Sequence, residues 1–197
     1  AKAEDAVGLS RVFDTAWRED RTSICGKALD ARLGAALALE AAARTPNAPN
    51  TLLLALTSLG QVDNRSVDAA ASDLLPDAAL ALGAHPVHPR RTPGVTPVVP
   101  GKGPVILLRS AGFVADRHLV ELLRTAAAQA RVSVQPAVAD GDPSGAGLIR
   151  SSGDGIATAA VLVPCIGVGT PEQRIDVRDL DAAAALVVRL LSRPLAA

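Results

Sequence analysis

The side chains with the spacing most typical of metal chemistry are His85 and His88. They lie in Ala84-His-Pro-Val-His-Pro89, so two imidazoles three residues apart could share a divalent ion, with Asp77 or Asp63 joining them in space. A proline-rich surface loop with ordinary histidines explains the same residues, and we favour that interpretation. His85 and His88 are therefore weak candidates for a metal site.

The remaining candidates for chemistry have weaker contexts. Ser144 lacks the Gly-x-Ser-x-Gly setting of a nucleophile, and no histidine is obviously its partner. His118 falls in the first turn of a predicted helix, where a solvated role is expected. Cys165 has apolar neighbours, which favour a buried and inert thiol. With Cys25 it completes the two cysteines of the chain, which are too few for a disulfide framework or a zinc knuckle, and we expect two ordinary buried thiols.

The composition narrows the classes of partner. Lys plus Arg and Asp plus Glu both number 20, so the formal net charge is zero and nothing draws the chain to nucleic acid or to an anionic membrane. One Trp, two Phe and no Tyr leave a core of Ala, Val, Leu and Ile. No apolar run approaches the ~18 residues of a membrane span. The charged start, Ala1–Asp5, does not resemble a signal peptide, so we expect a cytoplasmic protein.

Short apolar runs predict the strands that must position these residues. Residues 51–57 and 78–84 are nearly continuous in apolar side chains, which is typical of strands buried on both faces. Further strands are predicted at 104–110, 132–138 and 158–166, and residues 1–24 are interpreted as short extended structure. The proline-rich stretch 85–103 predicts a long surface loop.

Helices are predicted between these strands. Asp30 is expected to cap a helix and to favour its dipole, a structural role that needs no metal. Asp116 is expected to cap a second helix, and Asp176 with Asp179 resembles a capping box before the last one. Strands that alternate with helices predict a three-layer α/β/α domain with a mostly parallel or mixed sheet.

Several motifs resemble one enzyme family in their order along the chain. Gly26-Lys-Ala-Leu-Asp-Ala-Arg-Leu-Gly34, followed by an Ala/Leu helix, is similar to the Gly-Lys-Ala-Leu-Asp-Asp-Arg-Val-Gly segment of the tetrahedral aminopeptidases. That family includes glutamyl aminopeptidases and proteins called cellulase M. Gly101–Pro104, Val161–Pro164 and Thr170–Glu172 follow in the family's order. The resemblance implies that residues 25–197 form a domain like the catalytic domain of zinc aminopeptidases, with 1–24 a remnant of the family's inserted domain.

The resemblance also implies a set of catalytic positions. Family members hold two metal ions with two histidines, two aspartates and a glutamate, and a second glutamate is the general base that deprotonates a metal-activated water. Here Asp30 alone matches a family ligand. The histidine that precedes the inserted domain in the family has no counterpart in this sequence. The other positions have lost their side chains or their charge: Gly60 replaces the general base, Gln61 and Gly83 replace metal ligands, Gly145 replaces a loop aspartate and Gly169 replaces a histidine.

This pattern predicts a pseudoenzyme without catalytic residues, metal or cofactor. The sequence contains no glutamate between Glu40 and Glu121, so no shift of the alignment supplies the general base. We expect an interaction or assembly subunit, either a homo-oligomer or a chain paired with a protein that covers the surface left by the missing N-terminal segment. Two alternatives stay open: a metal-dependent aminopeptidase or hydrolase of the same family, and a module that binds a small molecule or peptide in the old cleft.

Overall fold

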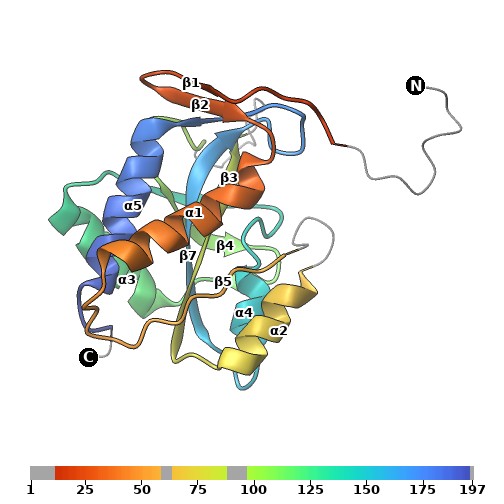
Figure 1. The fold of residues 1–197 in the computed structure, drawn as a ribbon. Coiled ribbons are helices and arrows are strands. Elements are labelled where there is room, and N and C mark those ends of the chain that lie inside the picture. The colour runs from red at the N-terminus through yellow and green to blue at the C-terminus, as the bar shows by residue number, and fades with distance from the viewer. Residues whose placement is uncertain (1–11, 59–63, 88–96, 196–197) are drawn as a thin grey trace, which may run out of the picture.

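The computed structural model describes residues 12–58, 64–87 and 97–195, which form three layers around one sheet (Figure 1). Helices α1 (Leu29–Arg44), α3 (Arg117–Ala130) and α5 (Val177–Leu191) pack on one face of the sheet. Helix α4 (Ala146–Ser151) packs on the other face, and α2 (Arg65–Leu74) lies against it. The predicted α/β/α architecture is therefore confirmed.

The sheet is mixed and is built around β7. Its strands are β1 (Arg18–Glu19), β2 (Ser23–Gly26), β3 (Ala78–Val87), β4 (Val105–Ser110), β5 (Phe113–Val114), β6 (Gln135–Val138), β7 (Ala157–Ile166) and β8 (Gln173–Asp176). Strand β7 pairs in parallel with β3 along its whole length, and its other edge pairs antiparallel with β4 and then with β8. The sheet continues from β8 through β2 to β1 on one side, and from β4 to β5 and β6 on the other.

Small side chains allow unusually close contacts in this core. Phe113 is the one buried aromatic residue, and the rest of the core is mostly Ala, Val and Leu. At Gly34 in α1, a Cβ atom would lie 2.2 Å from the Leu82 carbonyl oxygen and 3.2 Å from the Gly83 Cα. The helix backbone therefore rests directly on β3, and protein interiors are too densely packed to absorb an extra atom there without movement.

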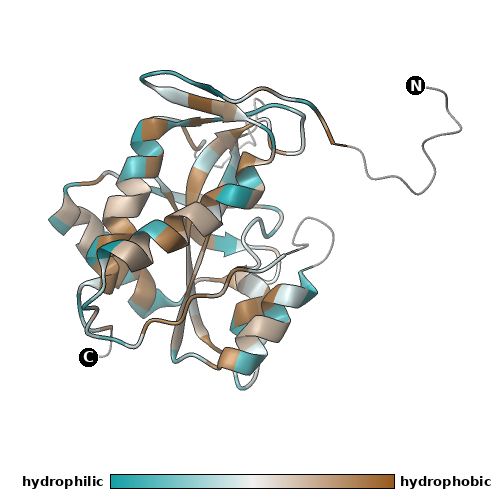
Figure 2. Ribbon diagram, in the orientation of Figure 1, coloured by the Kyte–Doolittle hydropathy of each residue, from teal (hydrophilic) through white to brown (hydrophobic). Residues whose placement is uncertain are grey.

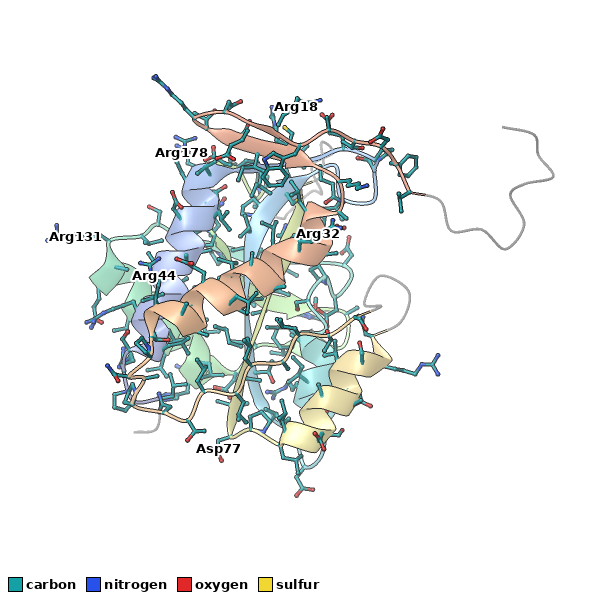
Figure 3. All side chains as sticks on the ribbon, viewed as in Figure 1. Arg18, Arg32, Arg44, Asp77, Arg131 and Arg178 are labelled. Atoms are coloured by element: carbon teal, nitrogen blue, oxygen red, sulfur yellow. The ribbon has the colours of Figure 1, made fainter. Side chains whose placement is uncertain are left out.

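The charged side chains surround this core. The residues labelled in Figure 3, from Arg18 in β1 to Arg178 in α5, all lie on the outside of the fold. Among the helices that the structure describes, none is long and apolar enough to cross a membrane.

The prediction of a buried strand at residues 51–57 is wrong. The segment is extended but joins no ladder within the described residues, and its leucines are about half exposed: Leu52 39%, Leu53 48%, Leu54 43% and Leu56 54%. Figure 2 shows this connection between α1 and α2 as a hydrophobic stretch at the surface. The sequence pattern indicates a tendency to be buried, but a strand also needs backbone pairing, and this segment makes none among the described residues.

One of the two helix caps predicted for α1 and α3 is confirmed and the other is wrong. Asp116 caps α3, because its carboxylate accepts a hydrogen bond from the Leu119 N–H at 3.0 Å. The N-cap of α1 is Ala28, so Asp30 is the second helical residue and places its charge in the first turn. The Asp30 N–H donates instead to Gln173 Oε1 at 2.8 Å, which satisfies a donor that a cap would otherwise take.

The predicted capping box at α5 is half right. Asp176 accepts a hydrogen bond from the Arg178 N–H at 2.9 Å and caps the helix. Asp179 does not reach back to the cap. Its side chain is fully buried and accepts hydrogen bonds from the Gly101 N–H at 2.6 Å and the Gly103 N–H at 2.7 Å. It therefore anchors the segment that leads into β4.

The proline-rich loop begins later than predicted. His85, Pro86 and Val87 complete β3, because the parallel register with β7 continues to the pair of Val87 with Ile166. Residues 88–96 lie outside the described residues, and 97–103 form turns and irregular backbone. Strand β6 is shorter than predicted and starts at Gln135. The expected domain boundary at residue 24 stays a prediction, and β2 on either side of it belongs to the main sheet.

Candidate functional site

Asp30 lies near the carboxyl ends of the parallel strands β3 and β7, where open α/β sheets usually place their ligands. It occupies the first turn of α1 and is half-buried. Its N–H bonds to Gln173, which is buried at the start of β8, and its carboxylate accepts from the Ala31 N–H at 2.8 Å. Sequence analysis had no signal for Gln173, since a single glutamine in a short strand has no distinctive pattern.

Cys165 lies close enough to Asp30 for the carboxylate charge to affect the pKa of the thiol. The thiol is fully buried in β7. Burial first, and then the Asp30 carboxylate, raise its pKa to about 12, and only the Arg174 backbone hydrogen bond acts in the opposite direction. The prediction of a buried thiol is confirmed for Cys165, and a thiol with a raised pKa is a poor nucleophile or ligand. The prediction is wrong for Cys25, which is a half-buried free thiol on the short strand β2.

Gly83 lies between α1 and the loop before α4. On one side its Cα faces Gly34, and on the other a Cβ at position 83 would lie 3.8 Å from the Pro143 carbonyl oxygen. Gly145 ends that loop as the N-cap of α4, where a Cβ would be 3.4 Å from the Val67 side chain. The fold therefore brings these two predicted positions into one region, with backbone and apolar groups around them.

Gly169 lies in the turn that follows β7 and is exposed. Its φ is +79° and a Cβ would meet nothing within 4 Å, so there is space for a side chain but a backbone conformation that favours glycine. The turn is held by Thr170, whose N–H donates to the Gly167 carbonyl at 2.9 Å and whose Oγ1 donates to the same oxygen at 2.7 Å.

The other candidates are separated or engaged elsewhere. His85 is 8% exposed in β3, opposite Pro164, whereas His88, Gly60 and Gln61 lie outside the described residues. Ser144 Oγ donates to Asp142 Oδ1 at 2.8 Å within a local turn. His118 is exposed, with Nε2 3.4 Å from the Leu195 carbonyl oxygen.

The donor set does not fit a two-metal centre. Hard divalent ions take several oxygen or imidazole ligands each. At the positions that the resemblance aligns with metal ligands of the family, Gly83 and Gly169 offer no side chain, and Asp30 is the one carboxylate among those that the structure describes. Within residues 12–58, 64–87 and 97–195, no three His, Cys, Asp or Glu side chains gather closely enough to hold a metal ion.

Two hollows in the surface are lined by other residues. One is lined by Asp20, Thr22, Ser23, Pro100, Ile166, Arg174, Ile175 and Asp176. The other is lined by Asp116, Arg150, Asp154, Gly155, Ile156 and Ala157. Neither coincides with the glycine positions, so these two hollows give no support to a ligand-binding module in the old cleft.

Comparison with known proteins identifies the family of this chain. The model of the M42 glutamyl aminopeptidase family matches residues 2–186. The chain belongs to the M42 glutamyl aminopeptidase family. The resemblance drawn from the Gly26–Gly34 motif is thereby confirmed.

Solved M42-like structures share the fold. A TET aminopeptidase from a marine sediment archaeon of the Thaumarchaeota superposes with a TM-score of 0.85 at 24% identity, over 91% of this chain and 52% of that one. An aminopeptidase from the archaeon Desulfurococcus kamchatkensis gives 0.85 at 26% identity, over 93% and 53%. A TET1 peptidase from Pyrococcus horikoshii, which can assemble into a tetrahedron or a large octahedral shell, gives 0.81 at 21% identity, over 95% and 57%.

This M42 chain is short beside its relatives. An aminopeptidase-type protein of Acetivibrio thermocellus is 24% identical over 169 residues, which make up 86% of this chain and 51% of that protein. The chain therefore spans about half the length of the curated relative and of the solved structures that it matches.

Proposed function

We propose that this M42 family member is a non-catalytic protein that acts as an interaction or assembly subunit. The observation that carries the proposal is the absence of side chains at positions that the resemblance assigns to the family's site: Gly83 and Gly169 align with metal ligands, and Gly145 aligns with a loop aspartate. Asp30 remains, but a single carboxylate does not hold a pair of divalent ions.

The general base is missing as well. In the family a glutamate removes the proton from the metal-bound water, and Gly60 at that position has no group that accepts one. Gln61 beside it is neutral, so it neither binds a cation as a carboxylate does nor replaces the base. Because no glutamate occurs between Glu40 and Glu121, the segment offers no substitute.

Exposed apolar side chains support the assembly role. The arm before β1 carries Val12 at 81%, Phe13 at 65% and Trp17 at 61% exposure, so two of the three aromatic residues of the chain face solvent. Aromatic residues are enriched at protein interfaces, and clustered apolar surface usually marks one. The Pyrococcus horikoshii relative assembles into closed shells, which favours self-association as the form of assembly here.

Metal content and mass on one purified sample test both parts of the proposal. Elemental analysis is expected to find no stoichiometric zinc, cobalt or manganese, and light scattering is expected to give a defined oligomer. Hydrolysis of leucyl- and glutamyl-p-nitroanilide, with each metal added in turn, is expected to match the blank, with an active M42 aminopeptidase as the positive control. Metal-dependent turnover would establish the alternative, a hydrolase, and a monomer at all concentrations would remove the assembly role.

A further inference from the structure

Strand β3 has one pairing partner in the sheet that the structure describes. It is ten residues long, and among the described residues it pairs with β7 alone. Proteins keep such strands from pairing with other chains by means of charges, prolines, short strand length or a covering loop or helix. Residues 78–87 contain no Asp, Glu, Lys or Arg, and Pro86 stands only near the end of the strand. Of these means of protection, a covering segment is the one left for most of β3.

The burial of β3 shows that it is covered. Each of its ten positions is buried or half-buried. Strand β6, which also has one described partner, is exposed at two of its four positions, and Pro136 removes a backbone donor there. Helix α1 lies on one face of β3 at the contact of Gly34 with Leu82, and the loop that leads into α4 lies over the other face beside Gly83. These elements cover the two faces, so the cover of the edge comes from a further segment.

The connection from α1 to α2 passes around β3 from one helix layer to the other (Figure 1). At its start, Asn50 Nδ2 donates to the Arg193 carbonyl oxygen at 2.8 Å, and Asn50 Oδ1 accepts from the Leu195 N–H at 3.2 Å. The connection is thereby attached to the segment that follows α5. At its end, the Ser58 carbonyl oxygen accepts from Ser66 Oγ of α2 at 2.6 Å, and α2 packs against α4. Because α5 and α4 lie on opposite faces of the sheet, the connection crosses at the edge of β3.

The residues between these two attachments suit a covering role. The four leucines of residues 51–57 are 39–54% exposed, so about half of the surface of each side chain lies against the protein. The segment is extended but joins no ladder among the described residues. It therefore adds no further paired strand to the sheet, and it brings no charge to an apolar edge.

This segment is attached less firmly than the strand beside it. Strand β3 is held by a ladder of ten residue pairs with β7. The ends of the connection are held by three side-chain hydrogen bonds, two from Asn50 and one from Ser66. Segments with few buried contacts open locally at a much lower free energy than that of global unfolding. Loss of these three bonds is therefore expected to release the segment while the domain stays folded.

We propose that residues 51–57 guard the edge of β3. They cover this edge and prevent another chain from adding a strand to it, and Asn50 and Ser66 hold them in place. Strand addition works through backbone hydrogen bonds and accepts many partner sequences, so a long uncharged edge requires such a guard. The inference does not rest on the proposed assembly role, because the exposed arm that supports that role lies against the turn after β7, where Thr15 Oγ1 donates to the Pro171 carbonyl oxygen at 2.7 Å.

A double variant that lacks both attachments tests the guard. Asn50→Ala with Ser66→Ala removes the three hydrogen bonds. The matched control is Asn47→Ala with Ser72→Ala, which removes exposed side chains of the same two types from the turn after α1 and from α2. Far-UV circular dichroism verifies that both double variants are folded.

Hydrogen exchange and light scattering supply the readouts. In the variant that lacks the attachments, the peptides that cover residues 51–57 and 78–87 are expected to exchange at least about tenfold faster than in the wild type. The peptide that covers α3 should keep its wild-type exchange rate, because the domain as a whole stays folded. The mass at a given protein concentration should rise above that of the wild type in this variant and stay at the wild-type value in the control.

The other outcomes overturn the inference in distinguishable ways. Faster exchange of residues 51–57 alone would show that they do not cover β3. Unchanged exchange of both peptides would show that Asn50 and Ser66 do not hold the segment. Faster exchange of both peptides at an unchanged mass would show that the cover does not prevent association. None of these results bears on the assembly role, which is judged from the mass of the wild type.

Discussion

Removal of the Asp179 carboxylate should destabilise the fold more than its position near a helix start suggests. The side chain is fully buried and accepts hydrogen bonds from the Gly101 and Gly103 N–H groups at 2.6 and 2.7 Å. In Asp179→Ala both donors lose their acceptor, and the close approach of backbone around Gly103 leaves little space for a replacement water. The segment before β4 would then lose its attachment to α5.

The magnitude follows from those two donors. A buried polar group that loses its partner costs about 1–3 kcal/mol, so two cost about 2–6 kcal/mol. Asp179→Ala also removes a buried carboxylate, and the desolvation cost that is avoided offsets part of the lost stability. We therefore expect the free energy of unfolding to fall by about 2–4 kcal/mol. Small domains are stable by only about 5–15 kcal/mol, so the loss is large enough to measure easily.

Chemical unfolding followed by far-UV circular dichroism measures the effect. Fluorescence of Trp17 is less suitable, since this residue is exposed on the arm before β1. Asp181→Ala removes an exposed carboxylate from the same helix and should change the free energy of unfolding by less than about 0.5 kcal/mol. If Asp179→Ala does not fold, Asp179→Asn keeps one acceptor and should lose about half as much. Equal stability of Asp179→Ala and the wild type would refute the reasoning.

The same residue predicts a dependence on pH. Burial raises the pKa of the Asp179 carboxyl, and the N–H groups of Gly101 and Gly103 offset part of that rise. A group whose pKa is higher in the folded than in the unfolded state stabilises the fold fully at pH values below its unfolded pKa. This stabilisation is lost as the pH rises through the folded pKa. The stability of the wild type relative to Asp179→Asn should therefore fall as the pH increases from about 4 towards neutrality.

Three further predictions test other contacts. The Cys165 thiol, whose pKa is raised to about 12, should resist iodoacetamide at pH 8 in the folded protein and react only after unfolding. Mass spectrometry of the labelled peptide measures this reaction, and rapid labelling of the folded protein would contradict the burial of the thiol. The pKa of Asp20 is lowered to about 2, chiefly by the hydrogen bond from the Thr22 N–H. The Asp20 carboxylate therefore stabilises the fold above its unfolded pKa, and this stabilisation is lost as the pH falls through about 2. Acid unfolding of Asp20→Asn should show a shallower pH dependence below about pH 4 than that of the wild type. Gln173→Ala should lower the free energy of unfolding in urea by about 1–2 kcal/mol, because the Asp30 N–H loses its acceptor. The control Glu172→Ala, in the preceding turn, should lower it much less. An equal loss of stability in the two variants would count against the contribution of the Gln173 contact.

The sequence predicted the elements whose local pattern and tertiary setting agree. Strand β7 is apolar except for Thr158 and is buried at eight of its ten positions, and the stripe on α3 faces the core as its spacing requires. Residues 51–57 have the same apolar pattern as β7 but join no ladder among the described residues, and a single sequence does not show which segments find a partner strand. Asp179 looked like a cap because its spacing from Asp176 fits one, and only the fold shows that its acceptors serve Gly101 and Gly103.

For the site, the sequence predicted candidate residues, and the fold shows where the described ones lie. The ordered set of motifs from Gly26–Gly34 to Thr170–Glu172 predicted the family, which no single segment decided. Gly83 and the loop that ends at Gly145 lie close together because β3 and α4 pack on each other, and no local sequence pattern predicts this contact. Gln173 was missed for the same reason, because its partner is 143 residues away in the chain.

The backbone at two of the glycine positions bears on whether catalysis could be restored. Gly145 has a φ of +69° and Gly169 a φ of +79°, values that cost a residue with a Cβ about 1–2 kcal/mol. A Cβ at position 145 would lie 3.4 Å from the Val67 side chain and a Cβ at position 83 would lie 3.5 Å from the Leu162 side chain, and both are ordinary contacts. If the chain is non-catalytic as proposed, the return of side chains to positions 145 and 169 would therefore strain two turns of the main chain. An engineer who wished to introduce ligands there would first redesign those turns.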